Sequence, residues 1–134
     1  MNLSGGCLCG AVRFAGVAEP VFQVKCHCSD CRKTAGAGHA AMIGVPEGAV
    51  VFTGEAREFR SLADSGREVT RAFCPRCGSG IYARPAAAAG LVFVRASALD
   101  NPDQFKPQMA VWTSSIAAWD VATPGIASFP KSPV

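Results

Sequence analysis

The chain carries seven cysteines, and their spacing is that of metal ligands. Each is separated from another cysteine by only one or two intervening residues, and they lie at Cys7, Cys9, Cys26, Cys28, Cys31, Cys74 and Cys77. An odd number of cysteines argues against a closed set of disulfides, and clustered thiols in a reducing compartment are typical of metal sites. Tetrahedral thiolate sites favour zinc. The pattern therefore predicts zinc binding.

The C-x-x-C segment that starts at Cys74 is the strongest zinc-binding turn. Pro75 presets φ and Gly78 tolerates a positive φ, so the turn closes without strain and turns both sulfurs to one side. In the first C-x-C pair, residues i and i+2 of an extended segment share a face. Four thiolates from two distant segments make a closed site, typical of structural zinc. We expect this structural site to be formed by Cys7, Cys9, Cys74 and Cys77.

The remaining cysteines, Cys26, Cys28 and Cys31, lie on one loop and supply only three thiolates. A catalytic zinc keeps its fourth position open for water or substrate. We therefore expect two zinc ions per chain, the second one catalytic. Seven thiolates and two Zn²⁺ ions would bring the formal net charge of +3 to zero.

Two other interpretations of the cysteines stay open. All seven could be structural, with His27 or His39 as the eighth ligand. His27 lies between two ligands and should point to the opposite face, whereas His39 could reach back through a glycine-rich turn. A redox role for the C-x-x-C segment would need a βαβ context, which the sequence lacks.

Charge and composition exclude several classes of function. The 13 basic and 10 acidic residues are scattered, and no basic stretch is interleaved with aromatic residues, so a nucleic-acid surface is not expected. Arg32 and Lys33, beside Cys31, either face solvent or attract an anionic substrate. No apolar stretch approaches the ~20 residues of a membrane span, and the first residues lack a signal-peptide pattern, so we expect a cytoplasmic protein.

The elements that must position these residues are short strands. Fourteen glycines and nine prolines divide the chain into short pieces, and apolar periodicity predicts an all-β (mainly β) single domain. Strands are expected at residues 11–15, 21–26, 40–45, 49–53, 58–62, 69–73, 81–84, 91–96 and 109–113, with a hairpin turn at 63–66. Helical turns are expected at 28–34, 100–105 and 115–119, a surface loop at 86–89, and an irregular tail at 121–134.

Three segments together resemble the glutathione-dependent formaldehyde-activating enzyme (GFA) family, also called the centromere protein V domain. They are residues 5–12 (GGCLCGAV), 26–33 (CHCSDCRK) and 73–79 (FCPRCGS). Weaker agreement continues to Trp119, so a zinc-binding domain is expected over residues 3–120. The resemblance implies a β-tent fold of several coiled antiparallel sheets, with the same division into a four-cysteine structural zinc and a three-cysteine catalytic zinc.

The resemblance also implies a carbon–sulfur lyase, exemplified by the condensation of glutathione with formaldehyde. We therefore expect a small-molecule thiol adduct, such as that of glutathione, as the partner, with Arg32, Lys33 and His39 as helpers at the zinc. A non-catalytic zinc-stabilised binding module and a metal buffer are the competing functions. The sequence departs from the family at Ala110, Ile116 and Ser97, where relatives commonly have a histidine, a basic residue and a glycine. An apolar wall at Ala110 and Ile116 would disfavour glutathione.

Overall fold

Eleven strands and one α-helix form the regular structure of residues 1–133, the part of the 134-residue chain that the computed structural model describes. The strands are β1 (Asn2–Gly6), β2 (Arg13–Val17), β3 (Phe22–Cys26), β4 (Ala40–Pro46), β5 (Val50–Thr53), β6 (Arg57–Leu62), β7 (Glu68–Phe73), β8 (Gly80–Pro85), β9 (Leu91–Arg95), β10 (Met109–Val111) and β11 (Ala127–Ser128). The helix is α1 (Ser29–Ala35), and 3₁₀ turns lie at Glu47–Ala49, Ala86–Ala88, Ala96–Ala98, Pro102–Gln104 and Thr113–Ser115. Within residues 1–133, no helix has the length and apolarity to cross a membrane.

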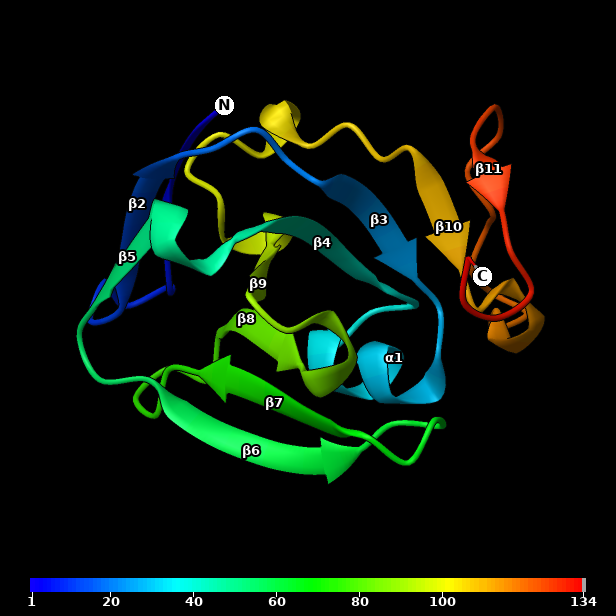
Figure 1. Cartoon of the computed structure of the whole chain (residues 1–134), viewed down its shortest axis with the longest axis horizontal. Coiled ribbons are helices and arrows are strands. Elements are labelled where there is room, and N and C mark those ends of the chain that lie inside the picture. The colour runs from blue at the N-terminus through cyan, green and yellow to red at the C-terminus, as the bar shows by residue number, and fades with distance from the viewer. Residues whose placement is uncertain (134) are drawn as a thin grey trace.

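The strands form two sheets in a single domain, which confirms the expected all-β fold. One sheet has three strands in the order β1-β2-β5, and the other has eight in the order β11-β10-β3-β4-β9-β8-β7-β6. Pairing is antiparallel except at β10, which runs parallel to both β3 and β11. In Figure 1 the three-stranded sheet closes one side of the molecule, and β10 and β11 lie at the opposite side.

Strand β4 is buried on both faces, and this explains its uninterrupted apolar sequence. Ile43 and Val45 pack into the main core, which draws residues from both sheets. Met42 points the other way, into a smaller apolar cluster that contains Cys26 and Cys31. The strand therefore separates the core that holds the fold from the cluster in which one group of cysteines lies.

All nine expected strands are present, with ends within two residues of the expected ones. The sequence reading missed β1, because glycines at positions 5 and 6 weaken its strand signal. The structure explains why position 5 is a glycine, because a Cβ there would lie 2.2 Å from the carbonyl oxygen of Ala98. Glycine thus lets the backbone around Ala98 cross β1 closely.

The C-terminal segment is more regular than expected. Strand β11 lies within the expected irregular tail and pairs with β10. The expected helical turn at 115–119 is wrong: the turn lies earlier, at Thr113–Ser115. Its position follows from the tail, because the amide N–H groups of Thr113 and Ser114 donate to the carbonyls of Phe129 and Pro130. Residues 86–88, expected to be a loop, form a 3₁₀ turn.

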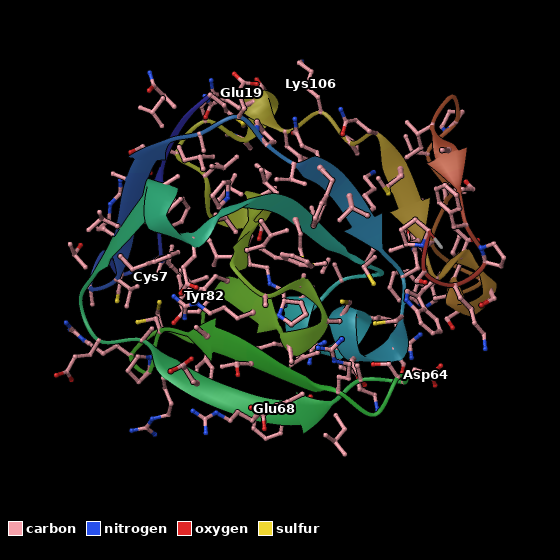
Figure 2. All side chains as sticks on the ribbon, viewed as in Figure 1. Cys7, Glu19, Asp64, Glu68, Tyr82 and Lys106 are labelled. Carbon is pink, nitrogen blue, oxygen red and sulfur yellow. The ribbon has the colours of Figure 1, made fainter. Side chains whose placement is uncertain are left out.

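The β6–β7 hairpin has the expected turn. The N–H of Ala63 donates to the carbonyl oxygen of Arg67 at 2.8 Å, and Gly66 takes a φ of 81°. A positive φ is the conformation that favours glycine in such turns. Figure 2 shows Asp64 of this turn near the end of β6, at the opposite end of the molecule from Cys7.

Candidate metal centres

The four-cysteine cluster joins the two sheets. Cys7 follows β1 and Cys9 lies in the connection to β2, whereas Cys74 and Cys77 lie in the turn between β7 and β8. Their four Sγ atoms lie within 4.8 Å of one another. Cys9 Sγ is 3.7 Å from the Sγ atoms of both Cys7 and Cys74. Zn–S bonds of about 2.3 Å place tetrahedral sulfurs about 3.8 Å apart, so the cluster has the dimensions of a zinc site.

Local backbone structure prepares this cluster for thiolates. The N–H of Val12 donates to Cys7 Sγ at 3.2 Å, and this hydrogen bond is the main reason that the pKa of Cys7 is lowered. Hydrogen bonds from the hydroxyl and the N–H of Ser79 lower the pKa of Cys77 to about 5. The turn closes through the N–H of Gly78, which donates to the carbonyl of Cys74 while Gly78 has a φ of 79°.

The second cluster is built by the start of α1. Cys26 ends β3, Cys28 is the N-cap of α1, and Cys31 lies in the first turn of the helix. The N–H of Cys31 donates to Cys28 Sγ at 3.3 Å, and the three Sγ atoms lie within 4.8 Å of one another. Three thiols this close share protons, so the pKa of Cys28 is lowered and that of Cys26 is raised. A tetrahedral ion held by three thiolates would keep a fourth position for another ligand.

The three cysteines lie on the wall of a cavity of about 330 Å³. Its other walls are almost entirely apolar: Phe22 and Val24 of β3, Met42 of β4, Val69 of β7, Ala83 and Pro85 of β8, Phe93 of β9, Met109 and Val111 of β10, and Trp112 and Pro133. Arg71, from β7, is the only charged residue among those between 1 and 133 that line it. The cavity therefore suits a largely apolar molecule that has at most one anionic group.

Two arginines that the sequence reading did not single out provide positive charge at the cysteine triad. Arg95 is 4% exposed, and its Nη2 donates to Thr34 Oγ1 at 3.3 Å. Burial lowers the pKa of Arg95, and attraction to the thiolate of Cys31 opposes that shift. Arg71 contributes to the lowered pKa of Cys28. The signal for Arg95 was present in the sequence, since it is the one charged residue of an otherwise apolar strand.

The expected helper residues lie elsewhere. Neither Arg32 nor Lys33 lines the apolar cavity, and Lys33 instead borders a separate surface cavity near Gly78. His39 and His27 do not group with the cysteine triad at ligand distance, so neither is placed as its fourth ligand. Both group with Asp120, which the sequence gave no reason to select.

The three departures from the family pattern also lie away from the apolar cavity. Ala110 is fully buried, and the neighbouring Met109 and Val111 line the cavity because alternate residues of β10 face opposite sides. Ile116 does not line it, and Ser97 borders two other cavities. The wall is apolar as expected, but other residues make it so.

Comparisons with known proteins identify the family and support the fold. The family model described as "Glutathione-dependent formaldehyde-activating enzyme" matches residues 2–115. A Halomonas elongata protein that carries the name of such an enzyme is 38% identical over 109 residues, which cover 75% of this chain and 68% of that protein. A crystal structure of a Rhodobacter sphaeroides protein has the same fold, with a TM-score of 0.60 at 16% identity over 95% of this chain and 99% of that one. The chain belongs to the glutathione-dependent formaldehyde-activating enzyme family.

Proposed function

We propose that the protein is a zinc-dependent carbon–sulfur lyase that makes or cleaves the adduct of a thiol and a small aldehyde. One observation carries the proposal: three cysteines of a single loop converge on the wall of an apolar cavity. A set of three thiolates with an open position matches a catalytic zinc, whereas the closed four-cysteine cluster matches a structural one. We therefore assign two zinc ions per chain, with Cys7, Cys9, Cys74 and Cys77 on the structural ion.

The donor atoms present fit zinc. The triad consists of soft sulfur ligands, and in the four-cysteine cluster the separations from Cys9 Sγ to the Sγ atoms of Cys7 and Cys74 equal the edge of a zinc tetrahedron within about 0.1 Å. Bound there, zinc supplies a Lewis-acidic position that keeps a substrate thiol ionised at neutral pH. Seven free cysteines also suit the reducing conditions of the cytoplasm, where we place the protein.

The chain's own residues would offset the charge of the reacting thiolate. Three thiolates and one Zn²⁺ leave a net charge of −1 before a fourth thiolate arrives. Arg95 and Arg71 are the cations whose charge reaches the triad. In the forward reaction the substrate sulfur bonds to the carbonyl carbon of the aldehyde, and the thiol proton ends on the carbonyl oxygen. In the reverse reaction the same cations stabilise the leaving thiolate.

The cavity wall would select the thiol. Glutathione has two carboxylates and an ammonium group, and the only charged partner among the described residues of the wall is Arg71. Burying a carboxylate or an ammonium group without a partner is costly. We infer that the preferred thiol has an apolar body and at most one carboxylate, and that the glutathione adduct of formaldehyde is a poor substrate by comparison.

The test is turnover of defined adducts by zinc-loaded protein. Hydroxymethyl adducts of glutathione, cysteamine and an apolar aryl-alkyl thiol are mixed with the protein, and exchange between adduct and free thiol is followed by NMR. We expect catalysed exchange in the wild type, its loss in Cys31→Ser, and its retention in Ser29→Ala, a control at an exposed position of the same helix. Absence of exchange with every adduct would favour the non-catalytic binding module, and full exchange in Cys31→Ser would show that the three-cysteine cluster does not carry the reaction.

A further inference from the structure

A third cluster of possible metal ligands lies outside both groups of cysteines. It consists of His27, between β3 and α1, His39, just before β4, and Asp120, near the C-terminus. Asp120 Oδ2 lies 3.3 Å from His27 Nδ1 and 3.1 Å from His39 Nδ1. Two imidazoles and one carboxylate, drawn from segments far apart in the sequence, thus meet at one point.

Hydrogen bonding does not account for His27. Its side chain is 1% exposed, and neither ring nitrogen has a hydrogen-bond partner in the described part of the chain. Nδ1 is close to Asp120 Oδ2, yet the direction of the contact is not that of a hydrogen bond. A buried imidazole with no hydrogen bond at either nitrogen is unusual, because buried polar groups are normally satisfied. A ligand held between the ring and the carboxylate would supply the missing interaction.

The separations match a shared metal ion. With bonds of 2.0–2.2 Å to nitrogen and oxygen, the donor atoms of a tetrahedral zinc lie about 3.3–3.5 Å apart. The separation of 3.3 Å between His27 Nδ1 and Asp120 Oδ2 equals that edge, and the 3.1 Å between His39 Nδ1 and Asp120 Oδ2, which is a hydrogen bond in this structure, is about 0.2 Å shorter. The two imidazole rings are tilted by 51° with centroids 5.1 Å apart, and in both rings Nδ1 is the atom close to the carboxylate.

The surrounding backbone makes room for the cluster and orients it. Asp120 Oδ1 accepts a hydrogen bond from the N–H of Val121 at 2.9 Å, which leaves Oδ2 to face the histidines. A Cβ at Gly38 would lie 2.3 Å from Asp120 Oδ2, so only glycine lets the carboxylate reach His39. The backbone N–H of His27 donates a hydrogen bond to the carbonyl oxygen of Val111 at 3.0 Å. Such outer contacts are typical of positioned metal ligands.

We propose that His27, His39 and Asp120 form a third metal site, for zinc or a similar borderline divalent ion. The two-nitrogen, one-oxygen set suits zinc, cobalt or nickel better than magnesium or calcium, which prefer oxygen ligands alone. Access is available from solvent, because the His39 side chain is 24% exposed and borders a cavity of about 190 Å³. The ion would tie the segment around Asp120 to the loop before β4.

Metal content tests the site without reference to catalysis. Zinc per chain is measured by mass spectrometry of the metal after gel filtration, at a fixed free zinc concentration. We expect about three ions per wild-type chain and about two in His39→Ala and in Asp120→Asn, because loss of one of three ligands weakens binding steeply. Asp64→Asn, in the exposed hairpin turn, is the matched control and should keep three. His27 is left in place because its neighbours in sequence are Cys26 and Cys28.

Cobalt distinguishes this site from the cysteine clusters. Thiolate ligands give intense charge-transfer absorption with Co²⁺, and a site without sulfur does not. His39→Ala should therefore lose one cobalt ion with no loss of thiolate absorption, and Gly38→Ala, which displaces the carboxylate from the other side, should do the same. The wild-type number of ions retained in both His39→Ala and Asp120→Asn would overturn the proposal, whereas an ion missing from the three-cysteine cluster, seen as weaker thiolate absorption, would overturn only the proposed function. A thermal melt in excess chelator identifies any variant that is unfolded. The metal content of the folded variants then decides whether the third site exists.

Discussion

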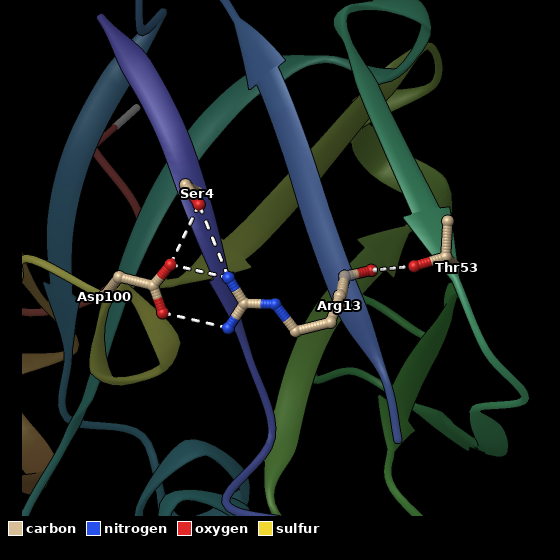
Figure 3. Close-up of polar contacts among 4 residues, drawn as sticks. All are labelled: Ser4, Arg13, Thr53 and Asp100. Atoms are coloured by element: carbon tan, nitrogen blue, oxygen red, sulfur yellow. Dashed lines mark hydrogen bonds and ion pairs between the residues drawn. The ribbon is translucent and has the colours of Figure 1, made fainter. Parts of the chain in front are cut away.

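Arg13 and Asp100, 87 positions apart in the chain, form a two-pronged ion pair on the outside of the three-stranded sheet (Figure 3). Arg13 Nη1 donates to Oδ1 at 2.9 Å and Nη2 to Oδ2 at 2.6 Å, and the hydroxyl of Ser4 donates to Oδ2 at 2.8 Å. Hydrogen bonds from Arg13 and then Ser4 lower the pKa of Asp100 to about 2. The pair fastens β2 to the segment that follows β9.

Asp100→Asn should therefore lower the melting temperature at pH 7. A lowered carboxyl pKa adds stability above the unfolded-state pKa of about 4, and this stability is lost as the pH falls toward 2. The gap in melting temperature between wild type and variant should be equal at pH 7 and pH 5 and should shrink below pH 4. Because both side chains are about half exposed, the gap should also shrink in high salt. Asp103→Asn is the control, and a gap that already narrows between pH 7 and pH 5 contradicts the assignment.

Substitution in the two cysteine clusters should have unequal effects. Cys77→Ser opens the cluster that joins the two sheets, and we expect it to lower the free energy of unfolding by more than about 4 kcal/mol, because metal binding there is part of the folding free energy. Cys31→Ser should leave a folded protein that has lost turnover. Thermal melts with and without a chelator measure both. Equal losses of stability in the two variants would contradict the division into structural and catalytic sites.

Removal of the buried cation at the triad should weaken metal binding there. We expect Arg95→Met to lower zinc affinity at the three-cysteine cluster about tenfold, because an uncompensated thiolate set is more costly to ionise. The four-cysteine cluster should keep its affinity. Competition with a chromogenic chelator measures the affinity of the ion bound weakly at the three-cysteine cluster separately from that of the ion bound tightly at the four-cysteine cluster. Arg32→Met, on the nearby helix surface, is the control, and an equal effect there would point to net charge and not to Arg95.

The cavity predicts the order of substrates. The kcat/KM for an adduct of an apolar thiol with one carboxylate should exceed that for the glutathione adduct, and Arg71→Met should lower the former about tenfold, because it removes the carboxylate's partner. The uncharged apolar adduct should be little affected by the same variant. Unchanged selectivity in Arg71→Met would mean that this side chain does not meet the substrate. Ala110→His is not a useful test, because the residue is fully buried and a larger side chain would disrupt packing.

Two glycines with the same backbone conformation should respond differently to alanine. Gly54 has a φ of 86°, and a Cβ there would lie 1.9 Å from the carbonyl oxygen of Ala11, whereas Gly66 has a φ of 81° and open space around it. We expect Gly66→Ala to cost about 1 kcal/mol from backbone strain alone, and Gly54→Ala to cost about 3 kcal/mol or more. Urea denaturation of both variants gives the comparison. Similar losses would mean that the backbone near Ala11 yields easily.

Local patterns predicted nine of the eleven strands and the two cysteine clusters, because strand periodicity and C-x-C or C-x-x-C spacing are properties of a few adjacent residues. The same patterns could not place Asp120 beside His39, since 81 residues separate them and only the parallel pairing of β10 brings the C-terminal segment close. Arg71 was hidden among the alternating charges of the β6–β7 hairpin. Because side chains alternate along β10, Ala110 and Met109 must face opposite sides of the strand. Which of these two sides lines the cavity depends on the packing of strands that are distant in the sequence.

The order of the cysteines along the chain has a consequence for biosynthesis. The triad at residues 26–31 emerges from the ribosome complete, whereas the four-cysteine cluster must wait for Cys77 and the cavity must wait for β9 and β10. For that interval three adjacent thiols are exposed to oxidants, with neither Arg95 nor the apolar wall beside them. Early capture of an ion by the nascent loop would protect these sulfurs from oxidation. The supply of metal during translation, and not only the stability of the finished fold, would then set the yield of intact protein.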